Sequence, residues 1–352
     1  MGELRRDPIV GRWVIVETET PLIPEMFEKE EHRWRGNECP FCYGNEDKTP
    51  PEIEAMRDPK TKPNTPGWQV RVVPNKFPAL QIEGNIDRRG LGIYDMSSGI
   101  GAHEVIIQSP YHHKEIPDLL DEEVVNIIKM YCNRAQDLKK DKRFKYILVF
   151  KNYGPTAGAS LEHPHTQLIA LPMIPKNPAE EIEGALEYFE FRERCLFCDM
   201  LRQEMQEKIR LVAENKYFIA FCPFGSRFTF EIWILPKIHN SFYCAMKETE
   251  IADLAKILKE VLLRLKLTLS DPAYNFIIHT SPLDHDGDLA HYHWHIEIMP
   301  KLIRVAGFEW GTGFYIVSTP PELAAKYLRG AKILLGDVPQ LLGDVPQGDT
   351  PR

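Results

Sequence analysis

The sequence predicts an α+β fold built from two tandem copies of one unit, each a mainly antiparallel sheet with packed helices. Helix-like periodicity recurs at matching places: residues 118–140 and 247–267 carry apolar side chains at three- and four-residue spacing. An apolar strand-like run follows each helix, at residues 145–150 and 274–278. A histidine-rich strand then closes each half. Because these features occur in the same order, we interpret the chain as an internal duplication.

Further matches support the duplication. Glu104 stands eight residues before His112, and Glu231 stands eight residues before His239, with an apolar run between them in both halves. The histidine strands align without gaps, as His163-Pro-His165-Thr-Gln167 on His291-Tyr-His293-Trp-His295, and a proline follows five residues after each. Each half also has its own Cys-x-x-Cys pair upstream.

The boundary between the copies is expected near residues 173–190, where a proline-containing linker precedes an acidic helix. We therefore predict an N-terminal unit at 1–178 and a C-terminal unit at 179–333. The remaining residues, 334–352, repeat Leu-Leu-Gly-Asp-Val-Pro-Gln, and we predict a low-complexity tail there.

Composition limits the function classes. The chain has 352 residues and a net charge of −8, which does not suit non-specific nucleic-acid binding. No stretch approaches the about 18 apolar residues of a membrane span, and residues 1–8 show no apolar signal core. We therefore expect a cytoplasmic protein with neither a nucleic-acid nor a membrane partner.

The strand from His163 to Gln167 is the strongest candidate for chemistry. It follows a Gly-containing loop that ends in Gly158-Ala159-Ser160, a type of loop that lets backbone N–H groups approach a phosphate. Alternation along a strand places His163, His165 and Gln167 on one face. Imidazole is a good nucleophile toward phosphorus at neutral pH, and a Gln amide can donate to a non-bridging phosphate oxygen. The pattern predicts a nucleotidyltransferase with a covalent histidine intermediate, although simple structural histidines remain the alternative.

Two metal centres are predicted from the Cys-x-x-Cys pairs. We expect the first zinc ligands to be Cys39, Cys42, His112 and His163, which leaves His165 as the nucleophile. The second set comprises Cys195, Cys198, His239 and one histidine of the second strand, for which the duplication alone favours His291. Four ligands close a tetrahedral site, so both ions are expected to be structural. A redox pair or unpaired core cysteines are the alternatives.

With these residues in view, the chain resembles the galactose-1-phosphate uridylyltransferase family, a branch of the histidine-triad superfamily, over roughly residues 5–330. Its landmarks are Asp7-Pro-Ile-Val-Gly-Arg-Trp-Val, Cys39-Pro-Phe-Cys42, Val73-Pro-Asn75-Lys-Phe-Pro-Ala-Leu, Ser109-Pro-Tyr-His112, Phe150-Lys-Asn152, Gly158-Ala-Ser-Leu-Glu-His-Pro-His-Thr-Gln167 and Gly307-Phe-Glu-Trp-Gly-Thr-Gly313. The resemblance implies two histidine-triad-like units.

The resemblance also implies a reaction. UDP-glucose would transfer its uridylyl group to His165 and release glucose 1-phosphate. Galactose 1-phosphate would then take the uridylyl group from His165, with Gln167 on the phosphoryl oxygens. Substrate contacts are implied for Asn75, Asn152, Gly158, Ala159, Ser160, Gly307, Phe308 and Glu309. The family is usually dimeric, so a homodimer is expected. In members with two Cys₂His₂ zinc sites the last ligand corresponds to His293, and we adopt His293 rather than His291.

Other functions stay open. An ADP-sugar phosphorylase or adenylyltransferase would use the same histidine chemistry, and base choice cannot be derived from the motif. A histidine-triad nucleotide hydrolase is less favoured, because Gln167 stands where that class has a third histidine. A zinc-scaffolded binding module would need no nucleophile. One departure from the family is Val16-Glu-Thr-Glu-Thr-Pro21, where relatives often carry a basic loop.

Overall fold

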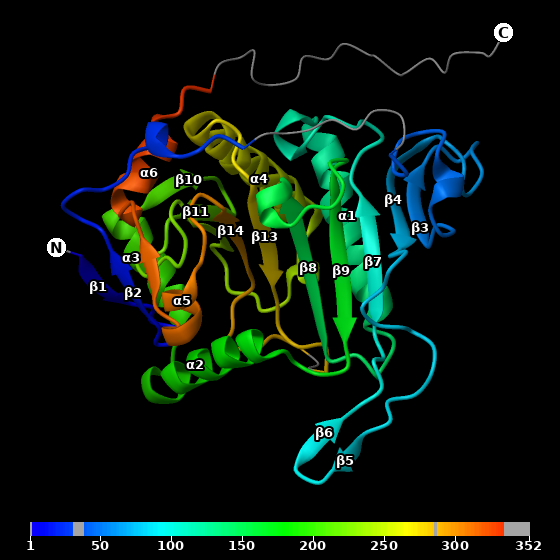
Figure 1. Cartoon of the computed structure of the whole chain (residues 1–352), viewed down its shortest axis with the longest axis horizontal. Coiled ribbons are helices and arrows are strands. Elements are labelled where there is room, and N and C mark those ends of the chain that lie inside the picture. The colour runs from blue at the N-terminus through cyan, green and yellow to red at the C-terminus, as the bar shows by residue number, and fades with distance from the viewer. Residues whose placement is uncertain (1, 31–38, 285–286, 334–352) are drawn as a thin grey trace.

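The protein is described by a computed structural model that covers residues 2–30, 39–284 and 287–333. Its centre is one ten-stranded sheet in the order β10-β11-β12-β14-β13-β8-β9-β7-β4-β3 (Figure 1). All of its paired strands run antiparallel. Two smaller sheets, β1-β2-β15 and β5-β6, lie outside it. This arrangement confirms the α+β class with antiparallel sheets.

The strands have the following bounds: β1 Glu3–Arg6, β2 Trp13–Val16, β3 Glu54–Arg57, β4 Trp68–Pro74, β5 Arg89–Leu91, β6 Tyr94–Met96, β7 Ala102–Ile107, β8 Tyr146–Tyr153, β9 His165–Leu171, β10 Leu211–Glu214, β11 Phe218–Phe221, β12 Ile232–Pro236, β13 Tyr274–His279, β14 His295–Pro300 and β15 Tyr315–Val317. The α-helices are α1 Asp121–Leu138, α2 Lys176–Arg192, α3 Leu196–Glu207, α4 Glu248–Leu269, α5 Gly307–Thr312 and α6 Pro321–Gly330. The 3-10 turn η5, Pro155–Ala157, follows β8.

The main core lies between the sheet and the two long helices α1 and α4, which cover one face of it. Both helices follow their expected periodicity. Nine residues of α1 and eleven of α4 are buried, and these carry the apolar stripe that packs on the strands. The helix-like segments at 118–140 and 247–267 and both apolar strands are therefore confirmed. The opposite face of the sheet carries the candidate site residues His165 and Gln167 of β9.

The N-terminal and C-terminal halves contribute equivalent strands to the main sheet. These strands are arranged symmetrically about the central β8–β13 pair. β8 pairs with β13 at the centre, with Phe150 opposite Ile277, and each neighbours its own histidine strand, β9 or β14. The register gives the equivalences. Phe150 pairs with Gln167 and Ile277 pairs with Glu297, so Gln167 and Glu297 occupy matching positions.

Two of the sequence alignments are therefore wrong. His165 matches His295 and His163 matches His293, a shift of two residues from the gapless alignment on His291. The Glu104–Glu231 match is off by one residue, because Val105 opposite Gln167 corresponds to Trp233 opposite Glu297. A one-residue shift in a strand moves a side chain to the other face of the sheet.

The predicted boundary between residues 178 and 179 falls within the first turn of α2. The division into units at 1–178 and 179–333 stays a prediction, and the tail at 334–352 lies outside the described residues. In the described part of the chain, no helix combines the length and apolar character that a membrane crossing requires.

Candidate active site and metal centres

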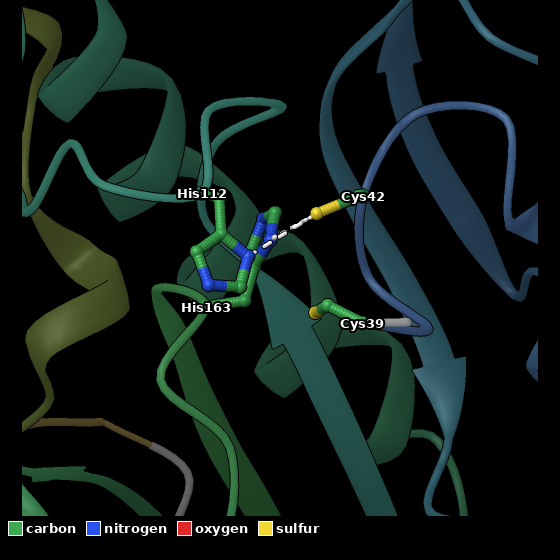
Figure 2. A group of neighbouring side chains, drawn as sticks. All are labelled: Cys39, Cys42, His112 and His163. Atoms are coloured by element: carbon green, nitrogen blue, oxygen red, sulfur yellow. Dashed lines mark hydrogen bonds between the residues drawn. The ribbon is translucent and has the colours of Figure 1, made fainter. Parts of the chain in front are cut away.

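The first cysteine pair meets two histidines at one end of the sheet. Cys42 Sγ lies 3.2 Å from His112 Nδ1 and 3.5 Å from His163 Nδ1, and Cys39 completes the group (Figure 2). All four ligand atoms lie within 4.8 Å of one another. Tetrahedral Zn²⁺ with S₂N₂ ligands requires separations of roughly 3.3–3.8 Å. The group can therefore hold a metal ion of this type.

The second group matches the first. Cys195, Cys198, His239 and His293 also converge within 4.8 Å, with Cys198 Sγ 3.4 Å from His239 Nδ1 and 3.6 Å from His293 Nδ1. His291 is not part of it. Its backbone oxygen instead accepts a contact from Cys195 Sγ at 3.7 Å.

The imidazole orientations fit metal binding in both groups. His163, His239 and His293 each place Nε2 within hydrogen-bond distance of a backbone carbonyl, at 2.7, 3.1 and 2.9 Å respectively. A donor at Nε2 leaves the Nδ1 lone pair facing the two sulfurs, which is how outer contacts orient metal-binding histidines. The hydrogen bond between the two cysteines lowers the pKa of Cys39 to about 3 and raises the pKa of Cys42, so Cys39 is the cysteine of this pair that is favoured as a thiolate.

His165 opens β9 immediately beyond the first group. Its Nδ1 lies 2.8 Å from the carbonyl oxygen of His163, so Nδ1 carries the proton and Nε2 keeps its lone pair. Burial lowers the pKa of His165 to about 4, which keeps the ring neutral at pH 7. Phe41, between the two cysteines, packs edge-on against this ring with centroids 5.4 Å apart. The loop that carries Cys39 and Cys42 therefore helps to fix the His165 ring.

Gln167 lies two residues further along the same face, and its oxygen is surrounded by donors. His103 Nε2 lies 2.8 Å from Gln167 Oε1, and Asn75 Nδ2 lies 3.5 Å from the same atom. The Asn75 amide is itself fixed, because its Oδ1 accepts from the backbone N–H of Phe77 at 2.9 Å. Asn75 thus lies beside the proposed catalytic strand.

The loop after β8 lies on residues from the other half of the chain. Asn275 Nδ2 donates to Asn152 Oδ1 at 2.8 Å and to the carbonyl oxygen of Ala157 at 2.9 Å. The amide nitrogen of Asn152 then faces Gly158, where a Cβ would lie 3.9 Å from it. Asn152 therefore presents a hydrogen-bond donor beside the loop.

The backbone amides of this loop are less available than its sequence indicates. Gly158 N donates to Pro155 O at 2.9 Å, and Ala159 N donates to Gly154 O at 3.1 Å. Both bonds close the turn itself. Gly154 and Gly158 have φ values of 81° and 87°, which explains the need for glycine at these positions. The loop leaves open space at Gly158 for a ligand, while Ser160 is exposed.

A buried polar network lies beneath His165 on the helix face of the sheet. Lys151 Nζ contacts Glu115 Oε2 at 2.9 Å, Gln108 Oε1 at 2.8 Å and the His165 carbonyl oxygen at 3.4 Å. Gln108 Nε2 donates in turn to Tyr131 and Thr166, both at 2.6 Å. These bonds hold the start of β9 in place from the helix-covered side of the sheet.

Gly307, Phe308 and Glu309 lie elsewhere, in the exposed helix α5. This helix precedes β15, which pairs with β2 at the side of the C-terminal half, away from β9 (Figure 1). Within one copy of the chain, the structure does not bring these three residues to His165.

A third group of buried side chains occupies the position equivalent to the His165 site. His279 Nδ1 lies 3.0 Å from Glu181 Oε2, and its Nε2 lies 3.3 Å from Glu297 Oε2. His295 stacks on His279 with ring centroids 4.7 Å apart. Arg227 also pairs with Glu297. Glu181 comes from α2, so this helix covers the second site.

Three residues near His165 were not identified from the sequence: His103, Lys151 and Asn275. His103 lies directly before the Glu of the repeat, and Lys151 lies within the Phe-Lys-Asn landmark, so both had a nearby signal. Asn275 had none, because its role depends on β13 pairing with β8.

Comparisons with known proteins agree with this geometry. Residues 4–175 match the galactose-1-phosphate uridyl transferase N-terminal domain, and residues 112–330 match a domain of unknown function, DUF4921. An ADP-glucose phosphorylase of Arabidopsis thaliana is 35% identical, over 93% of this chain and 92% of that protein. A galactose-1-phosphate uridylyltransferase of Thermotoga maritima is 30% identical, over 95% and 99%.

Solved structures show the same fold. The crystal structure of the Arabidopsis thaliana ADP-glucose phosphorylase with bound ADP-glucose has a TM-score of 0.79 at 34% identity, covering 95% of this chain and 100% of that one. A uridylyltransferase structure has a TM-score of 0.73 at 28% identity, covering 94% and 98%. Fold and site together define a nucleotidyltransferase of the histidine-triad superfamily. Within it, the chain belongs to the galactose-1-phosphate uridylyltransferase family.

Proposed function

We propose that the protein is a hexose-1-phosphate uridylyltransferase of galactose metabolism, which converts UDP-glucose and galactose 1-phosphate to UDP-galactose and glucose 1-phosphate. The observation that carries this proposal is His165, whose Nδ1 is bound to the His163 carbonyl while Nε2 keeps its lone pair. A neutral, fixed imidazole is the nucleophile that a ping-pong transfer requires.

The reaction takes place in two balanced steps. The Nε2 lone pair attacks the α-phosphorus of UDP-glucose, a P–N bond forms, and the bond from this phosphorus to the bridging oxygen breaks, releasing glucose 1-phosphate. A phosphate oxygen of galactose 1-phosphate then attacks the same phosphorus, the P–N bond breaks, and its electron pair returns to Nε2. No proton is gained or lost overall.

The neighbouring polar groups suit the charge that develops on the phosphoryl oxygens. Gln167 and Asn152 both have their side-chain oxygens occupied by protein donors, so each can direct an N–H toward the ligand. Neutral donors stabilise an oxyanion without transferring a proton to it. We include Asn75, Gly158, Ala159 and Ser160 in the same binding region, with Gly158 supplying space next to Asn152.

Two structural zinc ions are part of the proposal. Cys39, Cys42, His112 and His163 would hold the first, and Cys195, Cys198, His239 and His293 the second. The ions would stabilise the fold by closing the loops that carry the cysteines. His163 belongs to the first set and adjoins His165, so that set also supports the position of the nucleophile.

We also propose a homodimer. The segment between β4 and β7, which contains β5 and β6, projects from the body of the protein (Figure 1). It exposes several apolar side chains, with Phe77 83% and Ile93 89% exposed. Exposed apolar surface of this extent is typical of an interface. A second copy would also let Gly307, Phe308 and Glu309 reach a site from the partner.

A cytoplasmic location is proposed because thiolate ligands persist in a reducing compartment.

An ADP-sugar phosphorylase is the second candidate. It is favoured by the 35% identity to the Arabidopsis thaliana ADP-glucose phosphorylase, against 30% for the Thermotoga maritima uridylyltransferase. The acidic segment after β2, in place of a basic loop, also departs from many uridylyltransferases. The covalent step at His165 is common to both candidates, which differ in the base and in the acceptor.

The experiment is to incubate the protein separately with UDP-glucose and ADP-glucose, each labelled on the α-phosphate, and to isolate the protein. We expect a nucleotidyl group on His165 and its discharge by galactose 1-phosphate after loading from UDP-glucose. Labelling from ADP-glucose alone, with discharge by inorganic phosphate, would establish the second candidate. Absence of label from both donors would exclude both.

A further inference from the structure

We propose that His103 is a positioning residue that sets the orientation of the Gln167 amide, so that its N–H₂ group faces the transferred phosphoryl group. The inference rests on the proposed nucleotidyl transfer at His165 and adds a residue to it. His103 lies near the start of β7, and its partner on the neighbouring strand β9 is Ile169. One diagonal step along β9 brings its ring to the side chain of Gln167.

The protonation of His103 follows from a backbone contact. The N–H of Ala79 donates to His103 Nδ1 at 3.2 Å. A backbone amide cannot be inverted as a side-chain amide can, so Nδ1 must be the acceptor and must carry no proton. A neutral imidazole with a bare Nδ1 carries its proton on Nε2.

This tautomer determines the Gln167 amide. His103 Nε2 lies 2.8 Å from the Gln167 side-chain oxygen, so the Nε2–H group donates to that oxygen. Asn75 Nδ2 lies 3.0 Å from His103 Nε2 and 3.5 Å from the Gln167 oxygen. Because a protonated Nε2 cannot accept a hydrogen bond, the Asn75 N–H₂ group is left with that oxygen as its acceptor and adds a second donor on this side. With its oxygen held by two donors, Gln167 turns its N–H₂ group to the opposite side. An inverted amide would bring its hydrogens against those donors and its oxygen against the phosphate.

The contribution of His103 is to favour one orientation of the Gln167 side-chain amide over the inverted one. A Gln side chain alone chooses between two nearly isosteric orientations, of which only one supplies a donor to an oxyanion. Charge stabilisation in a transition state depends on donors that are already aimed before the reaction. His103 therefore acts through Gln167, and we expect it to raise the transfer rate more than substrate affinity.

The tautomer can be tested without activity. Long-range ¹H–¹⁵N spectra of the ¹⁵N-histidine-labelled protein should show His103 protonated at Nε2 and unprotonated at Nδ1, with H103Q used to assign the signal. An Nδ1–H tautomer would overturn the inference. This measurement decides the orientation even if the protein transfers no nucleotide, in which case only the proposed function fails.

The kinetic test uses single-turnover nucleotidylation of His165 by the active donor. H103F keeps a ring of similar size but removes both nitrogens, and should slow this step about 10- to 100-fold with KM changed less than about threefold. H103Q restores a donor near the Nε2 position and should recover most of the rate. H291F, the same substitution at a histidine of the other half, should leave the rate unchanged. In a Q167A background, H103F should cause no further loss.

Two results would overturn the role. The first is an H103F rate equal to that of the unmodified protein. The second is a loss that multiplies with that of Q167A, since this would mean that His103 acts independently of Gln167. Melting temperature and zinc content, measured on each variant, separate these results from a general loss of structure.

Discussion

The two halves of the chain place different chemistry on equivalent positions. In the N-terminal half these positions carry His165, Gln167, Asn152 and His103, while the C-terminal half has His295, Glu297, His279 and Glu231. Each half keeps its Cys₂His₂ group and a phenylalanine between the cysteines that packs on the matching histidine, with centroids at 5.4 and 5.2 Å.

The difference lies in charge and access. The N-terminal site has neutral amides next to the nucleophile, and Gln167 is partly exposed. The C-terminal positions hold buried carboxylates, paired with His279 and Arg227, and α2 covers them through Glu181. Carboxylates at these positions would repel a phosphate, and the charge network leaves no open face. The comparison predicts one reactive histidine per chain, although both halves share the same scaffold.

The largest effect should come from removing each histidine in turn. H165A should abolish the labelled intermediate and lower the transfer rate by more than about 10⁴-fold, because the nucleophile itself is lost. Its fold and zinc content should be retained. H295A should keep the intermediate on His165 and lose only stability. Label on His295 in the H165A protein, detected by peptide mapping, would contradict a single reactive site.

Exchanging the neighbouring residue between the halves gives the next largest effect. Q167E replaces an N–H donor by an anion facing the phosphate, and should slow nucleotidylation by about 10²–10³-fold. The matched change E297Q lies outside the site and should alter the rate less than about twofold, while it lowers stability by unbalancing Arg227. Stopped-flow or quench measurement of the first turnover distinguishes the two. Equal losses from both variants would show that the halves are catalytically coupled.

Much of this comparison was predictable from sequence, for reasons that differ by residue. Seven of the eight candidate metal ligands were predictable, because Cys-x-x-Cys pairs and a histidine strand are typical of tetrahedral coordination. The eighth, His293, came only from the family resemblance, since the duplication alone favoured His291. The helices followed from periodicity. Asn275 was not predictable, because its contacts with Asn152 arise only where β13 pairs with β8. The equivalence of His165 with His295 required the strand register, since a gapless alignment of similar letters placed it two residues away.

Loss of either metal site should lower stability, but only loss of the first site should also lower the transfer rate. C39S and C195S each remove one ligand, and each should reduce zinc from two ions to one per chain and destabilise the protein by more than about 4 kcal/mol. The C39S protein should also transfer about tenfold more slowly in its folded fraction, because Phe41 and His163 adjoin His165. The C195S protein should transfer at close to the normal rate. Metal analysis and thermal melting, with rates corrected for the folded fraction, provide the measurement.

The smallest effect on nucleotidyl transfer is expected from a pH dependence of stability that is confined to the C-terminal group. Despite its burial, the carboxylates of Glu181 and Glu297 raise the pKa of His279 from 6.5 to about 10. Since the folded-state pKa is the higher one, the stabilisation from protonated His279 is complete below about pH 6.5 and is lost as pH rises through 10. The free energy of unfolding should therefore fall between pH 7 and 10, and H279Q should flatten this decline. Denaturant titrations across this range would check it, and an unchanged slope in H279Q would assign the decline to other groups. Because Asn152 occupies the equivalent N-terminal position and does not titrate, N152A should leave the slope intact, which locates the pH response in one half of the duplicated sheet.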